Sequence, residues 1–207
     1  MSKVYDRVAL VGLGLIASSI FWASKRNDVS SYITGFARSK ETRDTAKKIG
    51  LCDEVFDTVE EAVKDADLVI LCVPVGAMEQ VILEIAPFLK TGATISDVGS
   101  VKRAVIDAVE PHLPTHVKFV PAHPLAGTEH SGPESGFASL FDNRWCLLTD
   151  HGSADKQTQN KVMSFWKSLG ANVEFMDADH HDLVLAVTSH APHLIAYTMV
   201  GVADDLG

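Results

Sequence analysis

Short apolar runs alternate with longer segments of helical period over the first two thirds of the chain. Alternation of this kind is typical of a parallel sheet covered by helices. One run, Leu68–Val73, is apolar without a break, as a strand buried on both faces should be, so we expect it at the centre of the sheet. The strands predicted from these runs are Arg7–Val11, Ile33–Phe36, Leu68–Val73, Thr94–Asp97 and Val117–Val120.

Helix signals fill the intervals between these strands. Thr58 stands three residues before Glu61, the spacing of a capping box at a helix start. Apolar residues recur on one helical face from Ala77 to Leu89. After His123 the pattern loosens into a Gly-, Ser- and Pro-rich stretch from Gly127 to Ser139. Beyond that stretch the sequence predicts a strand at Trp145–Leu148, a helix near Ala154–Leu169, a strand at Val173–Phe175 and a last helix from about His180.

These elements predict an α/β fold with a Rossmann-like, doubly wound, mostly parallel sheet in a domain spanning residues 1–176. The last helix, from about His180 to Asp204, is apolar around most of its circumference, and a helix of this kind needs to be buried. We therefore expect the given 207 residues to represent the protein incompletely and to self-associate through this helix.

Composition narrows the range of partners and locations. The chain has 46% hydrophobic and 22% charged residues, which is near the globular average. With 18 Lys and Arg against 27 Asp and Glu, its net charge of −9 disfavours nucleic acid and anionic membranes as partners. The three cysteines fit no disulfide framework, and we find neither a signal-peptide pattern nor 18 consecutive apolar residues. We expect a cytoplasmic protein.

A glycine-rich turn follows the first predicted strand directly. Gly12, Gly14 and Ala17 form G-x-G-x-x-A, with Leu15 and Ile16 opening the helix. Gly12 permits the tight turn, Gly14 lets a pyrophosphate approach the backbone, and the small Ala17 lets helix and strand pack closely. The position of the motif favours a dinucleotide site over a glycine turn without a ligand.

The end of the second predicted strand bears on the choice of cofactor. NAD-binding units usually carry Asp or Glu about 20 residues beyond the last motif glycine, where the carboxylate accepts from the ribose 2′-hydroxyl. Here that position is Ala37, and Arg38, Ser39 and Lys40 follow it with cationic and hydroxyl donors. We therefore favour NADP over NAD; the alternative is that Arg38 stacks on the adenine of NAD.

Five segments together carry a family resemblance: Gly-Leu-Gly-Leu-Ile at 12–16, Leu-Cys-Val-Pro-Val at 71–75, Asp-Val-Gly-Ser-Val-Lys at 97–102, His-Pro-Leu-Ala-Gly-Thr-Glu at 123–129 and Ser-His-Ala-Pro-His at 189–193. From about residue 7 to 200 the sequence resembles the prephenate/arogenate (cyclohexadienyl) dehydrogenases of tyrosine biosynthesis. One departure is Ala17, where the family usually has Gly.

The resemblance implies oxidative decarboxylation of prephenate or arogenate to 4-hydroxyphenylpyruvate or tyrosine, with hydride transfer to NADP or NAD. It implies that His123 is the catalytic base, that Ser100 orients it, and that Val73 and Pro74 contact the cofactor. A neutral imidazole suits such a proton transfer. Glu129, His190 and His193 are candidate substrate-site residues. The resemblance further implies that residues 177–207 are the first helix of a helical dimerisation domain, and hence a homodimer. On this basis we expect the given residues to bind a dinucleotide better than they turn over a substrate.

Three alternatives remain open. His190 and His193 could share a helix face and bind a metal with the acidic, His-rich run at 177–182, but that run is more simply a solvated helix start, so we expect no metal. Another NAD(P)-dependent hydroxy acid dehydrogenase would share the nucleotide fold. A noncatalytic dinucleotide sensor would keep the glycine turn but would not need Ser100 with His123.

Overall fold

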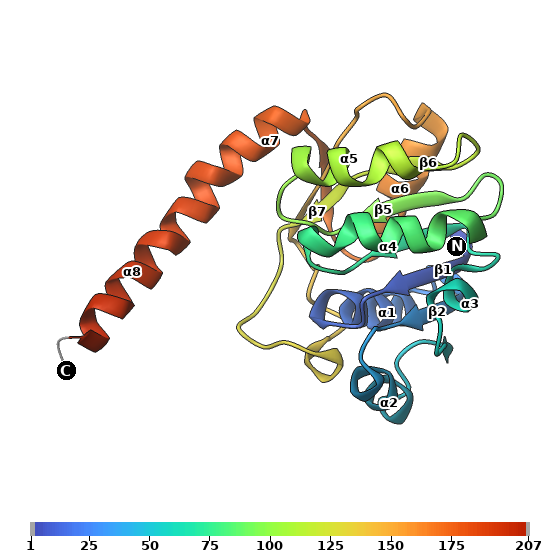
Figure 1. The fold of residues 1–207 in the computed structure, drawn as a ribbon, viewed down its shortest axis with the longest axis horizontal. Coiled ribbons are helices and arrows are strands. Elements are labelled where there is room, and N and C mark those ends of the chain that lie inside the picture. The colour runs from blue at the N-terminus through green and yellow to red at the C-terminus, as the bar shows by residue number, and fades with distance from the viewer. Residues whose placement is uncertain (1–2, 206–207) are drawn as a thin grey trace.

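A six-stranded parallel sheet forms the centre of the protein in a computed structural model that describes residues 3–205 (Figure 1). The strand order is β3-β2-β1-β4-β5-β6, with every neighbouring pair parallel. This is the doubly wound Rossmann order, which confirms the predicted fold class. The strands are β1 (Tyr5–Val11), β2 (Ser30–Phe36), β3 (Glu54–Val55), β4 (Leu68–Leu71), β5 (Thr94–Asp97) and β6 (Lys118–Val120).

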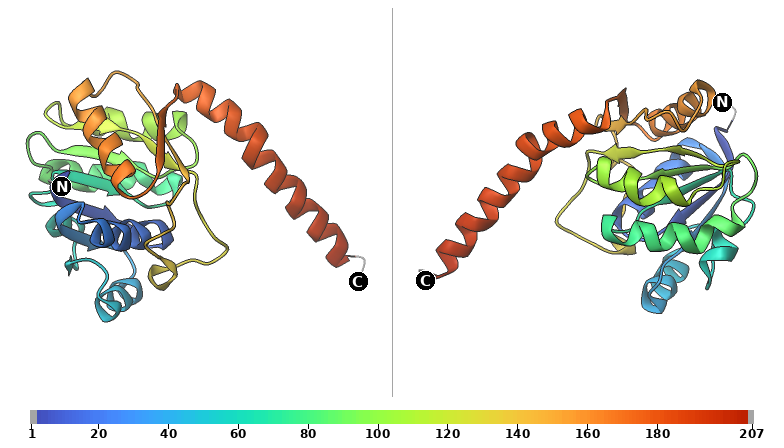
Figure 2. Two further views of the ribbon diagram at one scale, coloured as in Figure 1. Left: turned by 180° about the vertical axis from the view of Figure 1, so that it is seen from behind. Right: turned by 45° about the horizontal axis from the view of Figure 1, so that its top comes forward.

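Helices cover both faces of this sheet (Figures 1 and 2). One apolar core lies under α1 and α6, and a second lies under α3, α4 and α5. These helices are α1 (Leu15–Asn27), α2 (Lys40–Ile49), α3 (Val59–Val63), α4 (Met78–Ile85), α5 (Arg103–Val109) and α6 (Lys156–Ser168). Four short 3-10 turns are also present among the described residues. η1 (Val75–Ala77) precedes α4, η2 (Ala86–Phe88) follows α4, η3 (Glu110–His112) follows α5, and η4 (Pro133–Ser135) lies in the Gly- and Ser-rich stretch.

The two sharpest sequence signals are confirmed. All four residues of β4 are fully buried, and the strand lies between β1 and β5 in the interior of the sheet. The Thr58 hydroxyl accepts a hydrogen bond from the backbone N–H of Glu61, so it caps α3 as the capping-box spacing predicts.

A small second sheet continues from the first. It contains β7 (Ala122–Pro124), β8 (Trp145–Leu148) and β9 (Asn172–Phe175), with β7 antiparallel to β8 and β8 parallel to β9. Only Pro121 separates β7 from β6. The sequence analysis missed β7, because a three-residue strand next to a proline has no period to detect. This strand places His123 just beyond the carboxyl edge of the main sheet.

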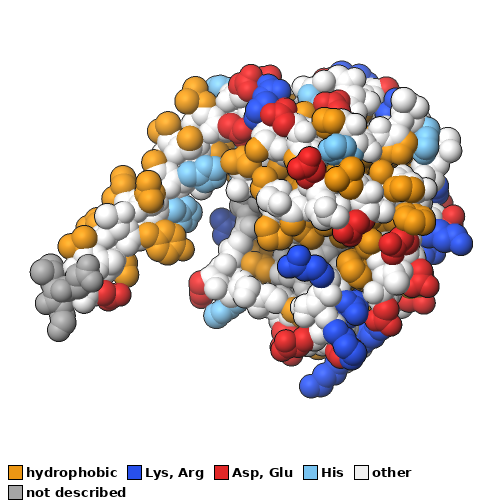
Figure 3. Space-filling view, viewed as in Figure 1, with side chains coloured by type: hydrophobic (Ala, Val, Ile, Leu, Met, Phe, Trp, Pro, Cys, Tyr) orange, Lys and Arg blue, Asp and Glu red, His pale blue; other side chains and the backbone are white. Residues whose placement is uncertain are grey.

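The last helical segment projects away from the rest of the protein (Figures 1 and 2). It consists of α7 (Ala178–Leu185), a π-helical turn η5 (Ala186–His190) and α8 (Ala191–Asp205). Most of its large apolar side chains from Leu183 to Val202 are exposed, with Tyr197 at 76% (Figure 3). The sequence analysis expected this helix to need a cover that the given residues do not supply, and the described residues leave these side chains uncovered. By length and mean hydropathy (1.4), Ala178–Asp204 is also long and apolar enough to cross a membrane.

Candidate active site

The turn between β1 and α1 has the geometry of a dinucleotide site. Gly12 has φ +100°, and a Cβ there would lie 2.6 Å from the carbonyl oxygen of Cys72, so only glycine fits. A Cβ on Gly14 would meet no atom within 4 Å, which leaves the space in front of α1 open. The first turn of α1 has no acidic residue and no side-chain cap, and its N–H groups are therefore free for a phosphate.

The end of β2 presents the residues expected at the adenosine ribose. Ala37 is buried, whereas Arg38 is exposed and Ser39 begins α2 as its N-cap. Arg43 braces this turn, since its Nη1 donates to the carbonyl oxygens of Ala37 and Arg38 at 2.8 and 2.9 Å. The described structure thus has no carboxylate at position 37 and an unblocked guanidinium next to it.

Two further expected cofactor residues lie next to the glycine turn. Val73 and Pro74 directly follow β4. The Cγ1 of Val73 would be 2.9 Å from a Cβ on Gly12. The turn after β4 therefore packs against the turn after β1, at the edge of the sheet where ligands of Rossmann folds gather.

The Gly- and Ser-rich loop folds back over α1. The backbone N–H of Phe137 donates to Ser19 Oγ at 3.2 Å, and η4 packs against both α1 and α2. A Cβ on Gly136 would stand 2.1 Å from Ser18 Oγ. The loop is therefore seated on the amino-terminal half of α1, beside the turn expected to hold the pyrophosphate.

A cavity of about 810 Å³ brings together the other predicted site residues. It lies between the carboxyl edge of the sheets and the final helical segment, and its volume is in the range usual for small-ligand sites. Its lining includes Ser100, His123, Glu129, His190 and His193. Residues from three separate segments of the chain thus converge as the sequence analysis expected.

These residues differ in solvent exposure and in their hydrogen-bond partners. His123 is 8% exposed, whereas the Glu129 side chain is 82% exposed. His193 Nδ1 donates to the carbonyl oxygen of Ser189 at 2.8 Å, a bond within the helix. Ser100 makes no side-chain hydrogen bond to His123 among the described residues. The expected orienting contact between these two residues is therefore not present in this structure.

His123 is instead held by two residues of α7. Its Nδ1 lies 2.9 Å from Nε2 of His181, and His181 Nδ1 lies 2.8 Å from Oδ1 of Asp182. Asp182 in turn accepts the backbone N–H groups of Lys102 and Arg103, at 2.7 and 2.9 Å, at the start of α5. A continuous chain of hydrogen bonds thus runs from His123 to the amino terminus of α5.

Both imidazoles are neutral in this arrangement. Burial, together with the charge of Lys102, lowers the pKa of His123 to about 3. Burial also lowers the pKa of His181, although Asp182 opposes the effect. Burial raises the pKa of Asp182, but the N–H groups of Lys102 and Arg103 outweigh it and bring the pKa below its usual value. The chain of hydrogen bonds therefore ends in an ionised carboxylate.

A fully buried ion pair supports the same region. Lys102 Nζ lies 2.5 Å from Asp97 Oδ2, and neither side chain is exposed. Lys102 Nζ also donates to the carbonyl oxygen of Ala122, and Asp97 Oδ1 accepts the N–H of the same residue. Because Ala122 precedes His123, the pair joins the loop that carries Ser100 to the strand that carries His123.

The acidic, His-rich run at 177–182 was only partly predicted. Asp177 caps α7 by accepting two backbone N–H groups, as expected of a helix start. The interpretation of the whole run as solvated is wrong, because His181 is fully buried and Asp182 binds α5. One signal was available: His181 shares a helix face with Ala178 and Leu185, and all three are buried.

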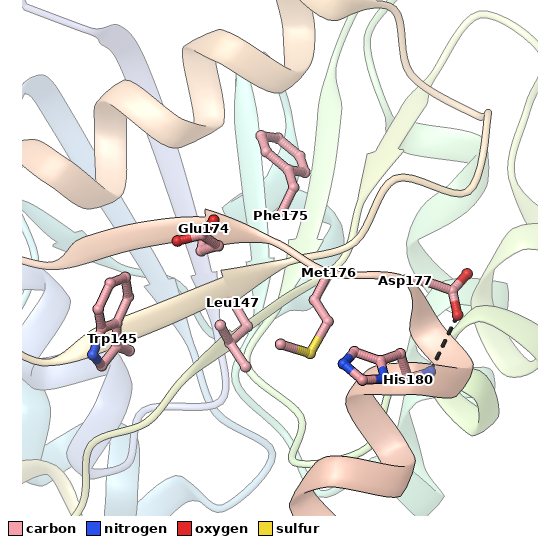
Figure 4. Close-up of a pocket in the computed structure, with 7 residues that line it drawn as sticks. All are labelled: Trp145, Leu147, Glu174, Phe175, Met176, Asp177 and His180. Carbon is pink, nitrogen blue, oxygen red and sulfur yellow. Dashed lines mark hydrogen bonds between the residues drawn. The ribbon is translucent and has the colours of Figure 1, made fainter.

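A second, smaller pocket of about 510 Å³ lies beside β8, β9 and the start of α7 (Figure 4). Trp145 and Leu147 of β8 line it with the end of β9, and His180 of α7 points toward Met176. Within residues 3–205 no group of three or more His, Cys, Asp or Glu side chains is arranged to hold a metal ion, either here or in the larger cavity.

Comparison with known proteins agrees with this geometry. The family model described as the prephenate dehydrogenase nucleotide-binding domain matches residues 22–175. The cyclohexadienyl dehydrogenase of Zymomonas mobilis is 43% identical over 201 residues, which cover 97% of this chain and 68% of that protein. The prephenate dehydrogenase of Bacillus subtilis is 35% identical over 204 residues, which cover 97% of this chain and 54% of that protein.

A solved structure shows the same fold. The prephenate dehydrogenase of Aquifex aeolicus, in complex with hydroxyphenyl propionate and NAD+, superposes with a TM-score of 0.88 at 31% identity. The match covers 98% of this chain and 70% of that one. Together with the family model, which matches well over half of the residues, these likenesses show that the chain belongs to the prephenate dehydrogenase family.

Proposed function

We propose that the protein catalyses the oxidative decarboxylation of prephenate or arogenate, with NADP or NAD as the hydride acceptor. The observation that carries this proposal is the position of His123: a neutral, nearly buried imidazole on the wall of an 810 Å³ cavity, next to the carboxyl edge of a Rossmann sheet. The likeness to cyclohexadienyl and prephenate dehydrogenases supports the choice of substrate.

The residues at the glycine turn fit a dinucleotide. Gly12 occupies a place that no Cβ could enter, Gly14 leaves open space, and the N–H groups of α1 face it without a competing cap. Val73 and Pro74 would contact the cofactor beside this turn. The nicotinamide, when bound, supplies the acceptor for the hydride that leaves the carbinol carbon.

His123 would act on the substrate hydroxyl. Since its Nδ1 is engaged by His181, Nε2 is the nitrogen available to take the hydroxyl proton as the hydride leaves. Loss of carbon dioxide then leaves an aromatic ring that carries a phenolate oxygen, and the proton held on His123 returns to that oxygen to give the phenol. Ser100 lines the same cavity and would orient the substrate hydroxyl as donor or acceptor.

The remaining polar side chains of the cavity would hold the substrate. Prephenate and arogenate both carry carboxylates, which suit imidazole and hydroxyl donors. His190 and His193 line the cavity from the final helical segment, and Glu129 lies on the loop opposite them. A carboxylate at Glu129 would complement the amino group of arogenate rather than the keto group of prephenate.

The end of β2 favours NADP. The exposed Arg38 and the hydroxyl of Ser39 would interact with a 2′-phosphate, and the absence of a carboxylate at Ala37 removes the group that would repel it. NAD is the second candidate, since the Aquifex aeolicus enzyme was solved with NAD+.

The test is an assay of the purified protein with both substrates and both cofactors, in which formation of the reduced nicotinamide is followed by absorbance. We expect reduction with at least one substrate, and a higher kcat/KM with NADP than with NAD. Tighter binding of NAD than NADP would refute the cofactor assignment. Cofactor binding without reduction by either substrate would refute the enzymatic function and favour a dinucleotide sensor.

We further propose that residues 177–207 belong to a helical unit separate from the domain at 1–176, and that its apolar face packs against a second copy of the chain in the cytoplasm. The support is the exposure of its large apolar side chains, which reaches 76% at Tyr197. The three free cysteines agree with a reducing compartment, and the net charge of −9 agrees with a protein that does not bind nucleic acid. Light scattering should give the mass of a dimer; a concentration-independent monomer would contradict the proposal.

A further inference from the structure

The hydrogen-bonded chain from His123 through His181 to Asp182 determines where protons reside. A carboxylate only accepts hydrogen bonds, and Asp182 is ionised because it accepts two backbone N–H groups of α5. The nitrogen of His181 that faces it, Nδ1 at 2.8 Å, must therefore carry a hydrogen.

The tautomer of His181 determines the tautomer of His123. A neutral imidazole has one N–H, so a His181 that is protonated at Nδ1 has an unprotonated Nε2 that can only accept. His123 Nδ1 lies 2.9 Å from that Nε2 and must be the donor. His123 is then protonated at Nδ1, and its Nε2 has a free lone pair.

We propose that His181, held by Asp182, is a positioning residue that fixes the tautomer of His123 and so keeps Nε2 ready to take the substrate's hydroxyl proton. The role of that proton rests on the proposed function, whereas the tautomer itself does not. Both rings keep their hydrogen bonds when His123 becomes cationic, because its Nδ1–H still donates to His181. No proton needs to leave His181 during the reaction.

Charges around the two rings come from several elements. The Lys102 ammonium at the start of α5 opposes a cationic His123, and so does His190 of η5 when it is protonated. Asp182 of α7 favours the cation, and Asp97 of β5 is already paired with Lys102. Asp182 is thus the nearby carboxylate not already paired with a side-chain cation, and it acts on His123 through His181.

A purely structural role for His181 would be to hold α7 against α5. That contact, however, is made by Asp182, whose two oxygens accept the N–H groups of Lys102 and Arg103 without help from His181. Arg103 adds an ion pair to Asp179 on the same helix. Changes at position 181 therefore separate the tautomer from the docking of α7.

The first test observes the tautomer directly. Nitrogen NMR of the protein labelled at histidine distinguishes protonated from unprotonated ring nitrogens, and loss of signals in His123→Asn assigns that ring. At neutral pH we expect His123 to be protonated at Nδ1. His181→Phe, which removes the acceptor, should abolish this preference. His181→Gln should keep it, since the amide oxygen can accept in place of Nε2.

The matched control is His180→Gln on the same helix, because His180 is exposed and its ring points toward Met176 (Figure 4). This variant should leave the His123 signals unchanged. A wild-type His123 protonated at Nε2, or an unchanged tautomer in His181→Phe, would overturn the proposal. Circular dichroism and dinucleotide binding verify that each variant is folded. If His181→Phe does not fold, the wild type and His181→Gln still test the proposal, because both should have His123 protonated at Nδ1.

The second test is kinetic. We expect His181→Phe to lower kcat by ~10²-fold or more, by analogy with the loss of an orienting carboxylate that leaves a catalytic histidine in the wrong tautomer. KM should change less than ~3-fold, and the acid limb of the pH profile should move. His181→Gln should recover most of the loss, and His180→Gln should match the wild type. A lower kcat in both position-181 variants alike, with an unmoved pH profile, would contradict the proposal.

The two tests distinguish a failure of the proposed function from a failure of the positioning role of His181. If no substrate is turned over, the proposed function is wrong, but the NMR result still decides the tautomer. If turnover is normal while His181→Phe keeps both kcat and the tautomer, the positioning role is wrong and the proposed function stands.

Discussion

His123 combines two properties that a general base needs in order to act at neutral pH. It is uncharged, because burial and Lys102 lower its pKa to about 3, and it faces a cavity that can hold a substrate. A pKa this low makes the ring a weak base in the free protein. In the proposed reaction, the gain is that one ring nitrogen stays unprotonated at neutral pH and so remains available to the substrate hydroxyl.

Replacing this residue should affect the chemical step alone. We expect His123→Asn to lower kcat by ~10²–10⁴-fold, the usual contribution of a positioned general base, while dinucleotide affinity stays unchanged. Steady-state kinetics and a fluorescence titration with the reduced cofactor measure the two quantities. An increase confined to KM would show that His123 binds substrate and that another group takes the proton.

A second residue-scale prediction concerns Ala37. A carboxylate at this position would accept from a ribose 2′-hydroxyl and repel a 2′-phosphate. We expect Ala37→Asp to shift the ratio of kcat/KM for NADP over NAD toward NAD by ~10- to 100-fold, from the worth of one charge-assisted hydrogen bond. Ala37→Asn, which adds a side chain of the same size as aspartate without its charge, is the control. An equal shift in both variants would show that size rather than charge is responsible.

At the scale of elements, the Gly- and Ser-rich loop at residues 127–139 packs directly on α1. Gly136 fits where a methyl group would stand 2.1 Å from Ser18 Oγ and 2.7 Å from the backbone nitrogen of Ser19. The loop therefore lies directly on the helix whose first turn is proposed to bind the pyrophosphate. Lifting the loop should disturb that turn.

Gly136→Ala tests this packing. We expect it to lower the free energy of unfolding by ~1–3 kcal/mol, the usual cost of forcing an extra methyl group into a packed site. Dinucleotide affinity should fall with it. Gly127→Ala in the same loop is the control, since a Cβ there meets nothing within 4 Å. Urea unfolding followed by circular dichroism gives the free energy of unfolding of each variant. Equal stabilities of the two variants would contradict the account.

The main sheet could be predicted from the sequence because its strands are long enough to show their pattern. β5 and β8 have the predicted bounds, and the other predicted strands differ by a few residues at their ends. β3 and β7 were missed, since two or three residues carry no period. The π-helical turn at Ala186–His190 was missed as well: Pro192 lacks an N–H, but the sequence does not specify how the helix adjusts.

At the scale of the whole molecule, the site is assembled from contacts that are remote along the chain. His123 and His181 are 58 residues apart, and Lys102 and Asp182 are 80 apart. Motifs predicted which residues line the cavity, because each motif ends a strand or faces a helix. They did not predict the partner of His123, because a hydrogen bond between two distant segments depends on how α7 docks against α5.

The buried histidines should also make stability depend on pH. His123 has a pKa of about 3 in the folded protein and ~6.5 when unfolded, so between these values the unfolded chain binds the additional proton. Stability should therefore fall as pH decreases from 7 to 5, with His123 alone contributing ~2 kcal/mol.

Urea unfolding of wild type and His123→Asn at both pH values checks this prediction. The wild type should lose ~2 kcal/mol more than the variant, in which position 123 no longer titrates. Equal losses in the two proteins would mean that His123 is not held neutral in the folded state.

The most direct test of the central claim measures reduced nicotinamide and released carbon dioxide in the same reaction of the purified protein with prephenate or arogenate. The account predicts equal amounts of the two products with at least one substrate, and loss of both together in His123→Asn. Reduced nicotinamide without carbon dioxide would contradict it, because the protein would then oxidise a hydroxyl group without decarboxylation and would be a different kind of dehydrogenase.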